Sequence, residues 1–116
     1  MAFTDSEIAE HTLTIEKHFW SKRRPPRELR DKIRERPRFP DQSLDLFFIR
    51  PHWRRSEETI ESPITRIRYV RSRQRWRIYW TRGDGKWHRY VPYPDALTLE
   101  KTLRVVEQNA NGCFFG

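Results

Sequence analysis

The sequence predicts an α+β fold with two N-terminal helices, an antiparallel meander of four to five strands, and a C-terminal helix. Apolar residues recur at helical spacing near both ends of the chain. Between them, short apolar and aromatic runs are separated by turn sequences, as the strands of a meander are. With 116 residues, of which 35% are hydrophobic, we expect one domain that spans residues 1–116.

The first helix is predicted from its cap and from its apolar spacing. Thr4 and Glu7 have the spacing of a capping box, in which each side chain binds the backbone N–H of the other residue. The helical face that follows consists of Ile8, Thr12, Ile15 and Phe19. Because Pro25–Pro26 disfavours helix in the residue before it, we expect the helix to end near Ser21–Arg24.

A second, shorter helix is expected from about Arg27 to Arg36. Leu29 and Ile33 are four residues apart and would both point inward. Glu28 and Lys32 have the same spacing and opposite charges, which supports a helix. A turn is expected at Pro40–Ser43.

Four strands are then predicted, at Leu44–Arg50, Thr65–Arg71, Arg75–Thr81 and Trp87–Val91. We expect two-residue turns at Arg73–Gln74 and Asp84–Gly85, since Asp-Gly readily adopts the positive φ of a tight turn. The C-terminal helix is expected to begin at Thr98, with an apolar tail after Gly112.

Alternation along these strands assigns each side chain to one face of the sheet. The predicted inner face, covered by helices, consists of Thr65, Ile67, Tyr69, Trp76, Ile78, Trp80, Trp87 and Val91. The predicted outer face consists of Arg66, Arg68, Val70, Arg77, Tyr79, Thr81, His88 and Tyr90.

The positive charge is concentrated in two segments. The chain has 24 Lys and Arg against 16 Asp and Glu, a formal net charge of +8. Residues 22–38 and 66–89 hold all of the excess, and most of these cations are arginine, which pairs with phosphate and stacks on rings. Two basic segments in an otherwise mildly acidic chain predict a polyanionic partner.

The leading hypothesis is therefore a nucleic-acid binding module for RNA or single strands rather than duplex DNA. We expect Arg66, Arg68 and Arg77 to contact phosphates, because their guanidinium groups would share one face. Tyr79 and Tyr90 would stack on bases, and His88 would donate or accept a hydrogen bond. No helix-turn-helix or zinc-finger pattern supports reading of a DNA major groove.

Three alternatives remain open. A metal-free ribonuclease could use the Arg, Lys, His and Tyr side chains of the same face, and the order of elements resembles that of ribosome-dependent mRNA-cleaving toxins, which have an additional first strand. The cationic face could instead dock an acidic protein partner. It could also be a solvated sheet face with Arg–Tyr stacking and no ligand.

Other classes of function find little support. The four histidines lack metal-ligand spacing, so we expect no metal and no cofactor, and no catalytic residue is assigned. A single cysteine, Cys113, excludes an internal disulfide. No apolar run reaches the roughly 18–20 residues of a membrane span, so we expect no membrane contact, and the single cysteine makes the cytoplasm the expected compartment.

Several short motifs along the chain also resemble a known family. They are Arg23-Arg24-Pro25-Pro26, Ile49-Arg50-Pro51 with Trp53, Ile60-Glu61-Ser62-Pro63, Trp76-x-Ile78-Tyr79-Trp80, Lys86-Trp87-His88-x-Tyr90 and Cys113-Phe114-Phe115-Gly116. This pattern resembles a family of small bacterial proteins that is classed only as a domain of unknown function. The resemblance implies a bacterial, single-domain, intracellular protein and implies no activity.

Overall fold

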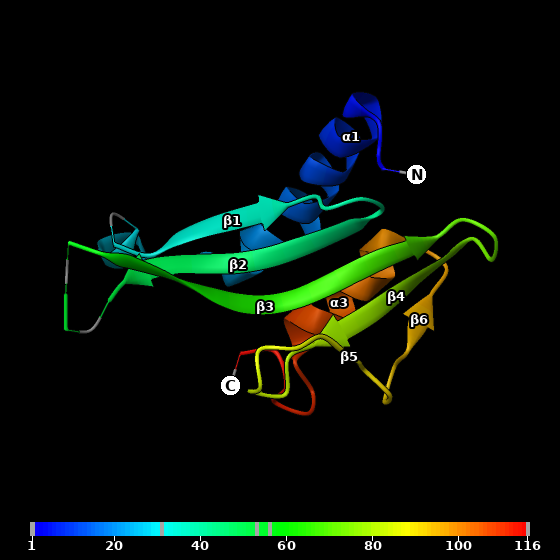
Figure 1. Ribbon diagram of the computed structural model, residues 1–116. Helices are drawn as coiled ribbons and strands as arrows, with labels where there is room; N and C mark the ends of the chain where they lie inside the picture. Colours follow the sequence, from blue (N-terminus) through cyan, green and yellow to red (C-terminus); the bar gives the residue numbers. More distant parts are fainter. Residues whose placement is uncertain (1, 31, 53, 56, 116) are drawn as a thin grey trace.

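The protein consists of an antiparallel sheet with helices on one face (Figure 1). This arrangement confirms the predicted α+β class. The computed structural model describes residues 2–30, 32–52, 54–55 and 57–115. The helical elements are α1 (Asp5–Ile15), the π-helical turn η1 (Glu16–Trp20), α2 (Ser21–Arg23), the 3-10 turn η2 (Arg27–Leu29) and α3 (Leu99–Gln108). The strands are β1 (Arg34–Arg38), β2 (Ser43–Pro51), β3 (Thr59–Val70), β4 (Arg75–Trp80), β5 (His88–Arg89) and β6 (Asp95–Ala96).

The strands follow the order β1-β2-β3-β4-β5, and β6 pairs with β4. In Figure 1, α3 lies behind the sheet, α1 rises above β1 and its helical continuation passes behind β1 and β2, and the ends of β2 and β3 on the left extend beyond the helices. We call the face toward α1 and α3 the helix face and the opposite one the outer face. Trp53 and Gly116, which belong to the family-like motifs, lie outside the described residues.

The N-terminal helix begins as its sequence predicts. The Glu7 backbone N–H donates to Thr4 Oγ1 over 3.1 Å, and the Thr4 N–H donates to Glu7 Oε1 over 3.0 Å. The helix continues through η1 and α2 and ends at Arg23, within the predicted range Ser21–Arg24. The next residue, Arg24, precedes Pro25, which disfavours helix there. Ile15 and Phe19 are fully buried against the sheet.

The second helix predicted for residues 27–36 does not form. Among the described residues of this range, only the 3-10 turn Arg27–Leu29 is helical, Leu29 is exposed, and Arg34 to Arg38 form strand β1 instead. Each residue of β1 pairs with β2, from Arg34 opposite Ile49 to Arg38 opposite Asp45. Pro37 explains part of the difference, because proline is unfavourable inside a helix but is tolerated in a strand at the edge of a sheet.

The β3–β4 hairpin keeps the predicted faces but not the predicted register. Ile67 lies opposite Ile78 and Val70 opposite Arg75, so residues 71–74 form the turn, two more than expected. An added pair of residues shifts the register by two and leaves every side chain on its face. Ile67, Trp76 and Ile78 are accordingly buried, while Arg66, Arg68 and Arg77 lie on the outer face.

The core lies between the sheet and the helices. Thr98 caps α3 as predicted, by accepting a hydrogen bond from the Lys101 backbone N–H over 3.1 Å. The C-terminal tail packs inward, with Phe114 buried and Phe115 stacked on Phe19 at 6.0 Å between ring centroids. The largest fully buried side chains are those of Phe19, Ile15, Leu44, Leu46, Ile67, Ile78, Leu103, Val106, Thr65 and Thr102.

His11 is expected to make the stability of the fold depend on pH. Its ring lies edge-on to Phe3 at 4.8 Å and to Trp76 at 5.2 Å between centroids, and burial lowers the pKa of His11 below its usual 6.5. Since the unfolded chain takes up this proton more readily, the free energy of unfolding should fall as the pH falls through 6.5. We expect a His11→Phe variant to show a smaller change in urea midpoint between pH 7 and pH 5 than the wild type. An equal change in both proteins would contradict this assignment.

Candidate nucleic-acid interface

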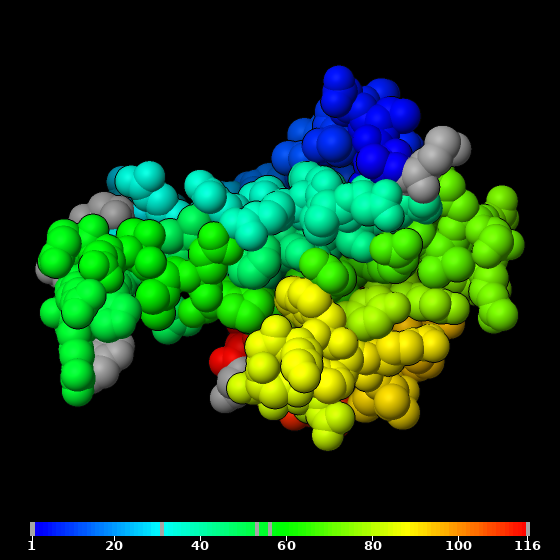
Figure 2. Space-filling view, viewed as in Figure 1, coloured from blue at the N-terminus to red at the C-terminus, as the bar shows by residue number. Residues whose placement is uncertain are grey.

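The outer face of the sheet carries arginine on four of its strands. Alternation within each strand places them on this face, opposite the buried side chains. They are Arg34, Arg36 and Arg38 on β1, Arg66 and Arg68 on β3, Arg75 and Arg77 on β4, and Arg89 on β5. Figure 2 views the molecule from this side, with β1 and β2 in cyan to green and the segment after β4 in yellow.

Arg66 is held by a buried carboxylate. Its Nε and Nη2 atoms donate to Asp45 Oδ1 and Oδ2 over 2.7 and 2.8 Å, and the Asp45 side chain is only 4% exposed. The hydrogen bonds to Asp45 raise the pKa of Arg66. The Arg66 guanidinium also lies 5.1 Å from the centre of the Trp87 ring. Arg66 is therefore tied within the sheet and less available to a ligand than the sequence suggested.

Two further arginines have acidic partners at the surface. Arg38 donates to both carboxylate oxygens of Glu61 over 2.7 and 2.8 Å. Arg68 Nη2 lies 3.7 Å from Asp41 Oδ2, a longer contact, and the Arg68 side chain is 43% exposed. Both pairs are open to solvent, so they neutralise their arginines less firmly than Asp45 neutralises Arg66.

Five arginines of the outer face have no ion pair with any residue that the structure describes, and one of them, Arg75, donates to the Gln74 carbonyl oxygen over 3.5 Å. We call the other four the unpaired quartet: Arg34, Arg36, Arg77 and Arg89. Three are exposed, and Arg77 is half-buried opposite Asp95 in the register of β4 and β6. The quartet lies on both sides of the paired Arg66 and Arg68, so positive charge without a partner spans the width of the sheet.

The predicted positions of His88 and Tyr90 are wrong. Tyr79 pairs with Arg89 and Trp80 with His88, so an odd number of residues, 81–87, joins β4 to β5 instead of a two-residue turn. Because the predicted connection has an even number of residues and the observed one an odd number, every side chain of the following strand lies on the face opposite to the predicted one. His88 and Tyr90 therefore lie on the helix face, and Trp87 and Arg89 on the outer face.

Contacts of these side chains agree with that exchange. Tyr90 is only 2% exposed, packs on Phe114 at 4.8 Å between ring centroids, and accepts a hydrogen bond from Asn111 at its hydroxyl. His88 Nε2 lies 2.7 Å from Asp84 Oδ2, whose pKa is lowered by the Lys86 backbone N–H and by His88. Val91, expected in the core, is 78% exposed. His88 and Tyr90 are thus separated by the sheet from the arginines with which they were grouped.

Tyr79 and Trp87 are half-buried aromatic side chains of the outer face, and the more deeply buried Phe47 shares this face, with the Arg38 guanidinium 4.9 Å from its ring centre. Tyr79 lies directly opposite Arg66 in the hairpin register and beside Arg89 on the next strand. Trp87 has the Arg66 guanidinium against its ring. The centre of this face therefore combines two rings with partnered and unpaired arginines.

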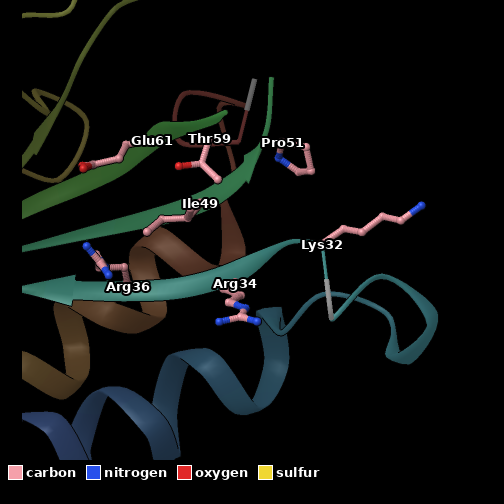
Figure 3. A pocket seen from close by; sticks show the side chains of 7 residues that line it. All are labelled: Lys32, Arg34, Arg36, Ile49, Pro51, Thr59 and Glu61. Atoms are coloured by element: carbon pink, nitrogen blue, oxygen red, sulfur yellow. The ribbon is translucent and has the colours of Figure 1, made fainter. Parts of the chain in front are cut away.

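A groove continues this surface over the part of the sheet farthest from α1 and α3. It has a volume of about 770 Å³. Figure 3 shows the side chains that line this groove, which come from β1, β2, β3 and the segment before β1: Lys32, Arg34, Arg36, Ile49, Pro51, Thr59 and Glu61. Three cations surround a floor of Ile49 and Pro51, and the single carboxylate, Glu61, is bound to Arg38.

Sequence reasoning missed Arg34, Arg36, Trp87 and Arg89. The run Arg34-Glu35-Arg36-Pro37-Arg38 alternates arginine with other residues, which is the period of a strand with one charged face. That signal competed with helical spacing of Leu29 and Ile33. No comparable signal marked Trp87, because its face depends on the length of the preceding loop.

Two kinds of site are not found within the described ranges. No group of three or more His, Cys, Asp or Glu residues there could hold a metal ion. No described helix has the length and apolar character needed to cross a bilayer.

Comparison with known proteins finds a family model that covers almost the whole chain. A family model described as Domain of unknown function (DUF3024) matches residues 3–116. No curated protein and no solved structure shows a significant match to the chain.

Proposed function

Since the chain belongs to the DUF3024 family, a domain of unknown function, we propose a function from its own surface: it binds nucleic acid, single-stranded RNA in preference to duplex DNA. The unpaired quartet is the observation on which this proposal depends. Guanidinium groups without acidic partners are available to phosphate, and each one neutralises a phosphate charge and releases a counterion.

The shape of the outer face favours a single strand over a duplex. A duplex is read by a helix or ribbon that enters a groove, and the described helices lie on the other side of the sheet. An open sheet surface with rings suits unstacked bases, which stack on aromatic side chains or guanidinium planes. Trp87, Tyr79 and the unpaired quartet supply both kinds of contact.

The Trp87→Ala variant tests the stacking contact. We expect it to lose about 1–3 kcal/mol of binding free energy for a single-stranded RNA, because base–ring stacking contributes about that much per base. Trp87→Phe is the matched control, since it keeps a ring at the same place and should retain most of the affinity. The measurement is fluorescence anisotropy of a labelled RNA, alone and annealed to its complement, with nuclease-treated protein.

Two results would overturn the proposal. One is a wild-type protein that does not bind the single strand at low salt. The other is equal affinity for the single strand and the duplex. A cytoplasmic, bacterial setting, expected from the sequence, would supply such RNA.

The ribonuclease and acidic-partner alternatives gain less support. The side chains proposed to cleave RNA do not share one face of the sheet. His88 lies on the helix face, where it is bound to Asp84, whereas the arginines and Tyr79 lie on the outer face. The same anisotropy samples, run on a denaturing gel, reveal any RNA cleavage directly. Loss of a co-purifying protein after nuclease treatment would show that nucleic acid, rather than a protein contact, joined the two.

A further inference from the structure

A second hollow lies on the helix face, between the end of the first helix and β2. Its volume is about 390 Å³, and its lining includes residues 22–26 together with Ile33, Phe48, Arg50 and Phe115. A neighbouring hollow of about 560 Å³ shares Phe48, Arg50 and Phe115 and reaches Gly83 and Gly85 in the loop after β4. We call the two together the helix-side groove. Because the two hollows share three residues, together they form a continuous strip, which suits an extended segment rather than a compact small molecule.

The described lining of the helix-side groove is cationic and contains no acidic residue. Two of its cations are already engaged. Arg24 binds Glu16 and Glu35, and Arg23 donates to the Glu107 carbonyl oxygen while its guanidinium lies 4.3 Å from the centre of the Phe115 ring. Lys22 and Arg50 are exposed and form no ion pair with the residues that the structure covers. Two cations at the rim are therefore available to carboxylates.

The floor of the groove is apolar, but its rings are already packed. Phe115 has Arg23 above its ring and Phe19 stacked on it with an interplanar angle of 15°. Phe48 lies against Trp20 at 5.7 Å and against Phe115 at 6.4 Å between centroids. Because Arg23 and the near-parallel Phe19 ring lie against Phe115, that ring offers a ligand mainly its edges. Aliphatic side chains pack well against ring edges, whereas a nucleic-acid base requires a free ring face.

We propose that the helix-side groove docks an extended, acidic segment of a partner protein, with carboxylates on Lys22 and Arg50 and aliphatic side chains against Phe48, Phe115 and Ile33. Charge complementarity selects the acidic residues, and the packed floor selects aliphatic ones over bases. This site lies on the opposite side of the sheet from the unpaired quartet, so it does not depend on nucleic-acid binding.

Selection from a random-peptide phage library tests the proposal with a defined probe. We expect the full-length protein to enrich peptides that combine Asp or Glu with Leu, Ile or Val. The enriched peptide, synthesised with a fluorescent label, should bind a Lys22→Glu/Arg50→Glu variant at least tenfold more weakly than wild type. The matched control is Lys17→Glu/Arg104→Glu, which changes the charge equally at two exposed positions outside the groove. Its affinity for the peptide should stay within about twofold of wild type.

Other outcomes would overturn this inference. It fails if no acidic and aliphatic consensus emerges, or if the enriched peptides bind the two double variants equally. It also fails if the Lys22→Glu/Arg50→Glu variant loses single-stranded RNA binding while the control keeps it, because the groove would then serve nucleic acid. Thermal unfolding of both variants verifies that each is folded. Wild-type RNA binding is measured separately, so failure of the peptide experiment leaves the outer face untouched.

Discussion

Replacing the unpaired quartet by alanine is expected to weaken binding to single-stranded RNA several hundredfold at about 0.1 M salt. Each arginine that contacts a phosphate contributes about 0.7 to the slope of log affinity against log salt concentration. Loss of four such contacts should therefore lower the slope by about 3. The measurement is anisotropy of a labelled RNA over a salt series between about 50 and 200 mM.

A second four-alanine variant provides the control for charge. It replaces exposed cations of the helical elements, away from the outer face of the sheet: Lys17, Arg27, Lys101 and Arg104. Its net charge equals that of the quartet variant, but its salt slope should remain close to that of wild type. If the two variants lose affinity and slope equally, only the net charge matters and the outer face is not the binding surface.

The Asp45→Ala variant is expected to lose about 2–3 kcal/mol of the free energy of unfolding. Removing the buried carboxylate leaves the Arg66 guanidinium without its two hydrogen bonds in a partly buried position. Breaking a fully buried pair in this way costs about 3–5 kcal/mol, and the 33% exposure of Arg66 allows water to recover part of that loss. Urea denaturation followed by circular dichroism measures the difference.

Two further variants test the cause of that loss. Glu61→Ala removes a bidentate partner of Arg38 at the surface, and it should cost less than about 1 kcal/mol. Asp45→Ala/Arg66→Met removes both charges, and it should recover much of the stability because no charge is left unpaired. An Asp45→Ala protein no less stable than Glu61→Ala would show that the pair contributes little.

Local signals predicted the helix termini well. The capping residues Thr4 and Thr98 act through hydrogen bonds to backbone N–H groups a few residues away, so the sequence contains all of their partners. The arginines of β3 and β4 also lie on the face predicted for them. The β3–β4 turn differs from the prediction by two residues, and an even change preserves alternation.

Features that depend on distant partners could not be predicted in the same way. Residues 34–38 satisfy a weak helical pattern locally, but pairing with all of Asp45–Ile49 stabilises them as a strand. The exchange of Tyr90 for Trp87 depends on whether the loop after β4 has an even or an odd number of residues. Gly83 and Gly85 both take positive φ, which marks a turn but does not fix its length. The ion pair between Arg66 and Asp45 joins two strands, and composition alone cannot reveal it. Arg66 was therefore predicted to be available to a phosphate.

Strand β1 has a consequence for how copies of this protein meet in solution. It forms one margin of the sheet, and such a margin could otherwise recruit a strand from a second molecule. Pro37 removes one main-chain donor there, and Arg34, Arg36 and Arg38 would oppose the same arginines of an approaching copy. The basic strand that we propose to bind RNA would thus also oppose strand-to-strand aggregation, and reversing its charges would have to be judged by solubility as well as by affinity.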